Sequence, residues 1–335
     1  MILAGIDIGT NTFRLLIAEA GPGVFREISS GRKITRLGQD LDRTGLLSRE
    51  AQERSVETLV EFSAQIGQHA VRHVSAAGTS ALRTASNSQA FIDQVKQRSG
   101  LDIRVLSGEE EARLTLLGVA RALQGTGGEE DSEPLSSALV IDIGGGSTEI
   151  IVTAPGHESR EVSLPLGAVY LSERFIRHDP PHGDELRLLR GAISEELDKH
   201  RENVFSFRPR VLAGTAGTIT TLAAMDQKLT EYDPDRINRS LLTRRSIEEM
   251  VLKLSAMSLR ERRTIPGLEH GREDIILAGA VITQEIMERC GSTTMLVSDW
   301  GLREGIVLDL YEKVGRAQRA DGKGHGAKGR EQGAL

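Results

Sequence analysis

Residues 6–17 read I-D-I-G-T-N-T-F-R-L-L-I, and residues 141–152 read I-D-I-G-G-G-S-T-E-I-I-V. The two stretches align without a gap at an offset of 135 residues (142 minus 7). In each, an apolar strand ends in Asp, a turn of small residues follows, and a second apolar strand leaves the turn. A repeat at this spacing indicates a duplication on the scale of a domain. The sequence therefore predicts two related α/β halves whose hairpins face each other.

The two turns are suited to bind phosphate, because small residues leave several backbone N–H groups accessible to anionic oxygens. The turn residues are Gly9, Thr10, Asn11 and Thr12 in the first copy, and Gly144, Gly145, Gly146, Ser147 and Thr148 in the second. Asp7 and Asp142, at the strand ends, are placed to hold Mg²⁺, a hard cation that prefers carboxylate and phosphate oxygens. Strand alternation puts Thr12 with Arg14, and Ser147 with Glu149, on faces that we expect to line a cleft.

A simpler interpretation is that the Asp-Ile-Gly turns only close hairpins, since Asp and Gly are common turn residues. Two copies at a fixed offset favour the phosphate site over this alternative. The chain contains no G-x-x-x-x-G-K-[ST] pattern, so the sequence does not support a P-loop enzyme.

Composition excludes several classes of protein. The 335 residues are 39% hydrophobic, which is enough for two domains that each bury a core. With 42 basic and 48 acidic residues the net charge is -6, so no overall positive field attracts nucleic acid or an anionic membrane. There is no signal-peptide pattern at the N-terminus and no apolar run of about 20 residues, so we expect a soluble, cytoplasmic protein. The single cysteine, Cys290, is expected to be a buried, inert thiol.

Periodicity and turn signals divide the chain into a first domain over 1–125 and a second over 136–302. A capping box formed by Ser107 and Glu110 predicts the start of a helix that continues to about residue 123. The Gly-rich, acidic segment 124–137 is interpreted as a flexible connection, and residues 315–335 as a disordered tail. A final helix over 303–314 is expected to pack back on the first domain.

Several motifs together resemble the exopolyphosphatase/guanosine pentaphosphate phosphohydrolase (Ppx/GppA) family. Besides the two hairpins they are G-T-S-A-L-R at 78–83, S-G-E-E-E-A-R-L at 107–114, L-P-L-G-A-V at 164–169, G-T-A-G-T-I-T-T-L-A-A at 214–224, R-E-D-I-I-L-A-G at 272–279 and V-S-D-W-G-L-R-E-G at 297–305. The resemblance covers residues 3–312. It implies two ribonuclease H-like domains of the actin/Hsp70/sugar-kinase superfamily with an active-site cleft between them, in a short form without the helical module of the long members.

The resemblance also implies roles for individual residues. Glu111 matches the residue that activates water, whereas its position alone fits an ordinary partner of the helix dipole. Asp142 and Glu149 resemble the cation-binding carboxylates, with Mg²⁺ as the cofactor and K⁺ as a candidate activator. Arg83 matches a phosphate-contacting arginine, and Arg14 and Arg272 match positions that contact guanosine tetraphosphate in related members. Arginine suits such roles because its guanidinium offers planar, bidentate donors.

The leading prediction is an exopolyphosphatase that releases orthophosphate from the end of polyphosphate. Alternatives are hydrolysis of guanosine pentaphosphate to the tetraphosphate, a guanosine-tetraphosphate sensor without activity, a filament protein, or a sugar or acetate kinase on the same fold. The G-T-A-G-T run at 214–218 is compatible with either nucleotide contact or tight packing. His178 and His182 are interpreted as surface residues and not as a metal site, and Trp300 as packing the return of the last helix. A homodimer is expected by analogy alone.

Overall fold

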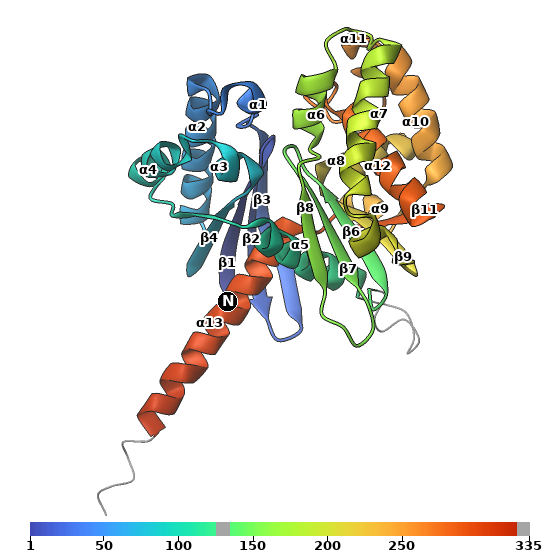
Figure 1. Cartoon of the computed structure of the whole chain (residues 1–335). Coiled ribbons are helices and arrows are strands. Elements are labelled where there is room, and N and C mark those ends of the chain that lie inside the picture. The colour runs from blue at the N-terminus through green and yellow to red at the C-terminus, as the bar shows by residue number, and fades with distance from the viewer. Residues whose placement is uncertain (125–134, 327–335) are drawn as a thin grey trace, which may run out of the picture.

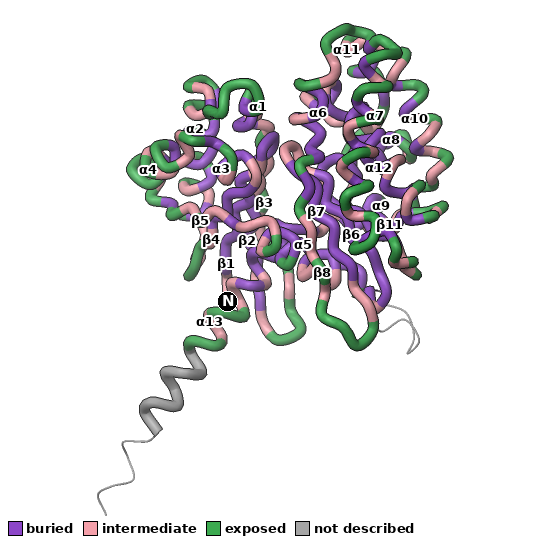
Figure 2. The backbone as a smooth tube through the Cα atoms, in the orientation of Figure 1, coloured by how far each residue is buried: buried purple, intermediate pink, exposed green. Residues whose placement is uncertain are grey.

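The computed structural model describes residues 1–124 and 135–326, with side chains described as far as residue 317. Most of the predicted connection and the last part of the predicted tail lie outside the described residues. Two mixed β-sheets stand side by side, each with helices packed against it (Figure 1). Buried backbone follows the two sheets and the helix faces turned toward them (Figure 2). Among the described residues, no helix is long and apolar enough to cross a membrane.

The first sheet has the strand order β3-β2-β1-β4-β5. Its strands are β1 (Ile2–Ile8), β2 (Thr12–Gly21), β3 (Val24–Ile34), β4 (His73–Gly78) and β5 (Ile103–Val105). The hairpin β1–β2 is antiparallel and β4 and β5 run parallel to β1, which is the expected ribonuclease H-like topology. β1 is apolar and almost wholly buried, whereas β3 contains only exposed and half-buried residues, as suits an edge strand.

The second sheet repeats this plan in the order β10-β11-β9-β6-β7-β8. Its strands are β6 (Ala138–Ile143), β7 (Thr148–Thr153), β8 (Arg160–Leu164), β9 (Val211–Thr215), β10 (Leu241–Thr243) and β11 (Thr294–Val297). In this order β8, β7, β6 and β9 take the places of β3, β2, β1 and β4. The duplication predicted from the two motifs is therefore present in the topology of both sheets.

Helices cover both sheets. Those in the first part of the chain are α1 (Leu41–Thr44), α2 (Arg49–Gly67), α3 (Ser80–Thr84), α4 (Ser88–Ser99) and α5 (Gly108–Leu123). The later ones are α6 (Ala168–Phe175), α7 (Gly183–Asp198), the π-helical turn η2 (Arg201–Phe205), α8 (Ala216–Asp226), α9 (Pro234–Ile237), α10 (Arg244–Ala256), α11 (Leu259–Arg262), α12 (Ile276–Cys290) and α13 (Leu302–Gly326). The predicted capping box at Ser107 and Glu110 is confirmed, with both reciprocal hydrogen bonds formed at 3.1 Å. Cys290 is a buried free thiol whose pKa burial raises to about 12, as expected of an inert residue.

Helices α5 and α13 are exchanged between the two sheets. The apolar face of α5, including Ala112 and Val119, packs on Val140 and Ile151 of the second sheet. α13 packs on the first sheet, where Val307 meets Leu3 and Leu16. We call the first sheet with α1–α4 and α13 the first lobe, and the second sheet with α5–α12 the second lobe. The predicted return of the last helix is observed, but α5, expected in the first domain, belongs by packing to the second lobe.

The final helix is longer than predicted, because it extends beyond residue 314 to Gly326. An i,i+4 ion pair between Glu312 and Arg316 supports the helix across Gly315, a poor helix former, and Ala317 follows with high helix propensity. Residues 315–326 are therefore helical where a disordered tail was expected. Figure 1 shows this part of α13 projecting away from both sheets.

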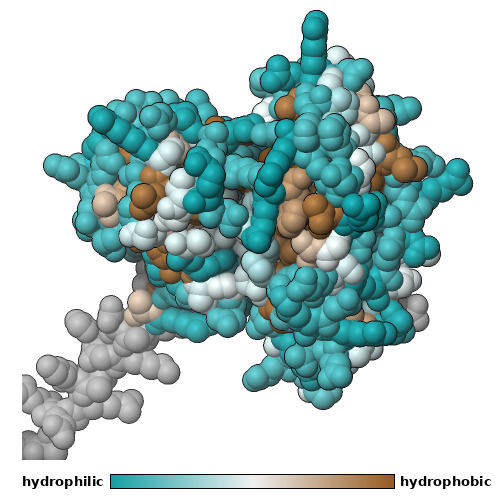
Figure 3. All heavy atoms as spheres, turned by 45° about the horizontal axis from the view of Figure 1, so that its top comes forward, coloured by the Kyte–Doolittle hydropathy of each residue, from teal (hydrophilic) through white to brown (hydrophobic). Residues whose placement is uncertain are grey.

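Polar contacts join the two lobes where they face each other. Arg36 donates two hydrogen bonds to Asp274, at 2.6 and 3.1 Å, and Arg32 pairs with Glu269. The backbone N–H of Asp40 donates to the Glu173 carboxylate. Figure 3 shows the two lobes with hydrophilic side chains over most of the visible face. The structure is thus a closed arrangement with a polar seam.

Candidate active site

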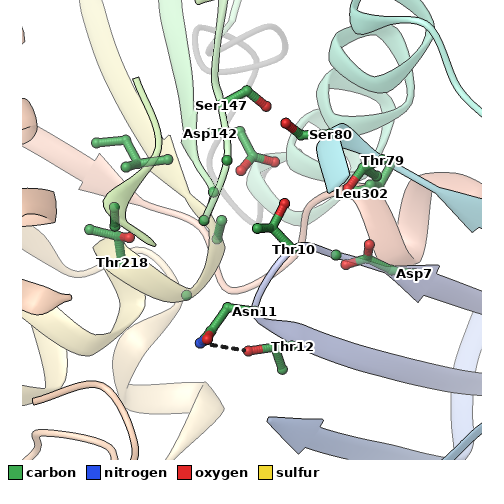
Figure 4. Close-up of a pocket in the computed structure, with 18 of the residues that line it drawn as sticks. Asp7, Thr10, Asn11, Thr12, Thr79, Ser80, Asp142, Ser147, Thr218 and Leu302 are labelled. Carbon is green, nitrogen blue, oxygen red and sulfur yellow. Dashed lines mark hydrogen bonds between the residues drawn. The ribbon is translucent and has the colours of Figure 1, made fainter. Parts of the chain in front are cut away.

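A cleft between the lobes is lined by both copies of the repeated turn (Figure 4). The turns have the same geometry, since Gly9 N–H donates to the Thr12 carbonyl at 3.2 Å and Gly144 N–H to the Ser147 carbonyl at 3.0 Å. Figure 4 shows Asp7 and Asp142 on either side of Thr10. Two small-residue turns with their flanking carboxylates therefore face each other, as the repeat predicts.

The glycines of the second turn allow this close approach. A Cβ atom on Gly145 would lie 3.1 Å from the Thr10 Cβ, and one on Gly146 would lie 2.5 Å from the Ser80 Oγ. Any side chain at either position would push the lobes apart or displace their polar groups. The Gly-Gly-Ser-Thr run thus brings two backbone turns within reach of one ligand.

The carboxylates of the second hairpin are held by hydroxyl groups. Thr115 of α5 donates to Asp142 at 3.1 Å, and Ser147 and Ser163 both donate to Glu149 Oε1 at 2.8 Å. Asp142 and Glu149 are directly paired across β6 and β7, so their side chains share one face of the sheet. The Asp142 Oδ2 and Glu149 Oε1 atoms are therefore held in place by hydrogen bonds within the protein itself.

Burial raises the pKa of every carboxyl group in this region. Desolvation, opposed by Arg14, raises the pKa of Asp7 to about 7. Desolvation and the neighbouring Asp142 raise the pKa of Glu149 to about 7, and burial also raises that of Asp142. Several acidic groups in one dry place disfavour full ionisation unless a cation joins them.

Glu111 lies in the first turn of α5 and reaches the cleft wall while only 7% exposed. Its Oε2 accepts a hydrogen bond from Arg83, which also donates to the Leu106 carbonyl at 3.1 Å and lies 3.8 Å from Glu149. Burial and Glu149 raise the pKa of Glu111 well above its usual value, and Arg83 acts in the opposite direction. Since Arg83 belongs to the first lobe, its bond to Glu111 crosses between the lobes.

Two further arginines line the cleft. Arg272 is buried and donates to the Thr12 hydroxyl at 3.1 Å and to Glu269 at 2.5 Å. Arg14 lies beside it and has no hydrogen-bonded or ion-paired partner in the part of the chain that the structure describes. Both guanidinium groups are available at the edge of the phosphate turns.

Most of the predicted site residues line this cleft. They are Asp7, Gly9, Thr10, Asn11, Thr12, Arg14, Glu111, Asp142, Gly144, Gly145, Gly146, Ser147 and Arg272. Three predicted residues are placed otherwise. Thr148 points to the opposite side of its strand and donates to the Leu166 carbonyl, Glu149 lies behind Ser147, and Arg83 is occupied by Glu111.

Four further residues contribute to the cleft, of which Thr79 and Ser80 were not predicted, whereas the run that contains Thr215 and Thr218 was left open between nucleotide contact and tight packing. Thr79 and Ser80 lie in the G-T-S-A-L-R motif, and Thr215 and Thr218 in the G-T-A-G-T run. These residues lie at or just after the ends of β4 and β9, which occupy matching places in the two sheets, and this equivalence could have indicated that both segments reach the cleft. Ala216, between the last two, adopts a left-handed conformation with φ of 70°, which is rare for a residue with a side chain.

Two other predictions bear on metals and aromatic contacts. Among the residues whose side chains the structure describes, 1–124 and 135–317, no group of three His, Cys, Asp or Glu side chains is gathered as a ready-made metal site. The rings of His178 and His182 stack at 3.8 Å, and His178 is exposed and pairs with Glu185. Trp300 packs against Phe25 of β3, with ring centroids 5.0 Å apart, so it joins the two lobes ahead of α13.

Duplicated ribonuclease H-like sheets, with matched small-residue turns facing each other over buried carboxylates, define an actin-like two-domain fold. Within that class, the chain belongs to the Ppx/GppA phosphatase family, whose sequence model matches residues 16–314. The predicted family and fold class are thereby confirmed.

Individual relatives agree with this assignment. The chain is 32% identical over 322 residues to Exopolyphosphatase 2 of Mycobacterium tuberculosis, covering 92% of this chain and 98% of that protein. It is 33% identical to the crystal structure of the Aquifex aeolicus Ppx/GppA family member, with a TM-score of 0.76 and coverage of 93% and 98%. The crystal structure of an exopolyphosphatase from Cytophaga hutchinsonii is 29% identical, with a TM-score of 0.84 and the same coverage.

Proposed function

We propose that this protein is an exopolyphosphatase, which hydrolyses the terminal phosphoanhydride bond of polyphosphate and releases orthophosphate. The observation that carries the proposal is the position of Glu111. A buried carboxylate lines the cleft that also holds both phosphate turns, and an arginine fixes its orientation. The relatives named exopolyphosphatase, similar over nearly their whole length, support the same substrate.

Hydrolysis at this site requires positioning, charge neutralisation and an oriented water molecule. The two turns bind the terminal phosphate through backbone N–H and hydroxyl donors, while Arg272 and Arg14 neutralise its oxygens. Glu111 accepts a proton from the attacking water as it adds to phosphorus, and the shortened chain leaves with its bridging oxygen. Arg83 favours the ionised form of Glu111 that this role needs.

The same residues suit a divalent cation, which we propose to be Mg²⁺ held by Asp142, Glu149 and Asp7. Asp7 and Asp142 line the cleft, and burial destabilises their charged forms in the absence of a counter-charge. Mg²⁺ is commonly bound by one or two carboxylates together with water and substrate phosphate, so a ready-made cage of three side chains is not required. When bound, the ion supplies charge neutralisation for the phosphate oxygens.

The test is phosphate release by the wild type, Glu111→Gln and Glu109→Gln, with Mg²⁺, on polyphosphate, guanosine pentaphosphate and ATP. Removing a general base lowers turnover by about 10²–10⁴-fold, so Glu111→Gln should lose nearly all activity. Glu109 lies in the same helical turn but is exposed, so its variant should retain activity. No release by the wild type from any of the three substrates would overturn the proposal.

Hydrolysis of guanosine pentaphosphate to the tetraphosphate is the second candidate function, because the cleft meets a further cavity at Arg14 and Ala216 that could accommodate more of a nucleotide. The parallel substrates rank the two activities, and tight binding of guanosine tetraphosphate without release would favour a sensor. Activation by K⁺ and a homodimer are proposed from the family resemblance alone. A salt series and analytical ultracentrifugation test them.

A further inference from the structure

Three arginines gather where the cleft meets the neighbouring cavity. Arg272 lines the cleft, Arg32 of β3 lines the cavity, and Arg14 lines both. The cavity is also bounded by Ala216, Thr220 and Tyr232. Because the cleft and the cavity share Arg14, a ligand bound at the phosphate turns could extend past Arg14 toward Arg32 and stay within the two connected cavities.

One carboxylate braces two of these arginines from opposite lobes. Glu269 Oε2 accepts hydrogen bonds from both Arg32 and Arg272, while Arg272 also reaches Thr12. Glu269 itself is not among the described residues that line either cavity. Glu269 therefore holds the two guanidinium groups from outside the cavities, and their remaining N–H donors stay available to a ligand inside them. Arg32 comes from the first lobe and Glu269 from the second, so closure assembles the group.

The three cations are not fully paired by the protein. The Arg32 Nε is buried without a hydrogen-bond partner among the described residues. Arg14 adds a like charge beside it. Burial, followed by repulsion from Arg14 and Arg272, lowers the pKa of Arg32 to about 9. A buried, unsatisfied donor next to like charges is unfavourable unless an anion completes it.

The acidic side chains of this cavity have other partners or lie at its rim. Arg303 pairs with Glu304 and lies 3.9 Å from Glu27, and the Tyr232 hydroxyl donates to Asp299. Asp235 is exposed. The unmatched positive charge is thus confined to the end of the cavity that adjoins the cleft.

We infer that Arg32, which lies in the cavity beyond Arg14 and Arg272, forms a second anion subsite that binds the phosphoryl group behind the terminal one in a condensed phosphate. The inference rests on the proposed function for the direction in which the substrate lies. Arg32 is a specificity residue that the motifs did not reveal, and Glu269 is the positioning residue that holds it. The subsite discriminates a chain of phosphates from a single orthophosphate.

The experiment measures ligand binding in a variant that does not hydrolyse its substrate. Glu111→Gln protein with Mg²⁺ is titrated calorimetrically with tripolyphosphate, guanosine pentaphosphate and orthophosphate, alone and combined with Arg32→Gln, Arg32→Lys or Glu269→Gln. Since a charge-assisted bond is lost, Arg32→Gln should weaken tripolyphosphate binding by about ten- to a hundred-fold. Orthophosphate binding should change by less than about two-fold, because a single phosphate bound at the turns with Arg14 and Arg272 does not extend to Arg32 in the neighbouring cavity. Arg32→Lys and Glu269→Gln should fall between.

Arg26→Gln is the matched control, because it removes an arginine from the same strand that pairs with Glu19 far from the cleft. Equal weakening of both inorganic ligands would place Arg32 on the terminal phosphate and overturn the inference, as would no weakening of either. A loss only for guanosine pentaphosphate would likewise overturn the inference, because Arg32 would then contact the nucleoside and not the second phosphoryl group. Because no hydrolysis is measured, the outcome is separate from that of the activity test.

Discussion

At the scale of single residues, the site concentrates acid groups that the fold cannot satisfy by itself. Asp7, Asp142, Glu149 and Glu111 are all buried, and Arg14 and Arg83 are the cations beside them. In the unfolded chain the same carboxyl groups ionise freely near pH 4. Folding the metal-free protein therefore becomes less favourable as these groups ionise.

This difference predicts a pH-dependent stability of the metal-free protein. The raised pKa of Asp7, about 7 against 3.8, favours the folded state while the group is protonated, so this contribution is complete below pH 4 and lost as the pH rises through 7. Asp7→Asn should remove up to about 4 kcal/mol of destabilisation above pH 7. Thermal melts from pH 5 to 8 should show a flatter profile for the variant than for the wild type. Added Mg²⁺ should raise the melting temperature of the wild type at pH 8, and identical profiles for the two proteins would contradict the assignment.

Arg83 provides a second prediction at this scale. Its removal leaves Glu111 and Glu149 buried without their shared cation, so Arg83→Gln should destabilise the protein by about 3 kcal/mol in a denaturant titration at pH 8. Arg104→Gln, which breaks the exposed pair with Glu110, should change stability by less than about 1 kcal/mol. Similar losses in both variants would show that Arg83 has no special role in the buried cluster.

Motifs foresaw the residues whose identity is required by backbone geometry. Gly145 and Gly146 could be predicted because only glycine permits the approach of Thr10 and Ser80. Arg32 and Glu269 could not, because they belong to segments without a motif and meet only through tertiary packing. Thr148 was wrongly included among the phosphate-binding hydroxyls, although the alternation that places Ser147 and Glu149 on one face puts Thr148 on the other.

At the scale of elements, the decisive feature is the crossing of α5 and α13. Gly118 of α5 lies against the backbone of Gly301, and Gly305 of α13 lies against that of Leu114. The two helices touch backbone to backbone, which fixes the height of Glu111 and Thr115 relative to the turns. The capping box at Ser107 and Glu110 revealed where α5 begins, but not which sheet the helix covers. β3 was missed altogether, because its sequence V-F-R-E-I-S-S-G-R-K-I neither alternates in polarity nor contains a long apolar run.

The crossing predicts a sharp difference between two helical glycines. A Cβ atom on Gly118 would lie 2.0 Å from the Gly301 carbonyl oxygen, so Gly118→Ala should destabilise the protein by about 2–3 kcal/mol and reduce turnover. Gly191 lies within α7 with nothing near its Cβ position, so Gly191→Ala should stabilise by about 0.5–1 kcal/mol. Chemical denaturation and phosphate release measure both effects. Equal responses would contradict a tight crossing.

At the scale of the whole molecule, the polar seam between the lobes sets how firmly they close. Arg36 and Asp274 are each about one-third exposed, so their bond contributes modestly, about 1 kcal/mol or less. Asp274→Asn should therefore raise the KM for polyphosphate by about two- to five-fold at low salt, with little effect on the melting temperature. At 0.5 M salt the wild type and the variant should converge. Glu249→Gln, which removes an exposed pair on α10, is the control and should leave KM unchanged.

The exchange of helices also has a consequence for biosynthesis. Leu3, Leu16, Ala18 and Ala20 emerge from the ribosome early, but Val307 of the helix that covers them is among the last residues made. While the second lobe is being translated, this apolar face of the first sheet therefore remains exposed to solvent. Folding of the first lobe is therefore complete only after α13 has been synthesised. A chain truncated before α13 should expose this apolar face permanently and aggregate.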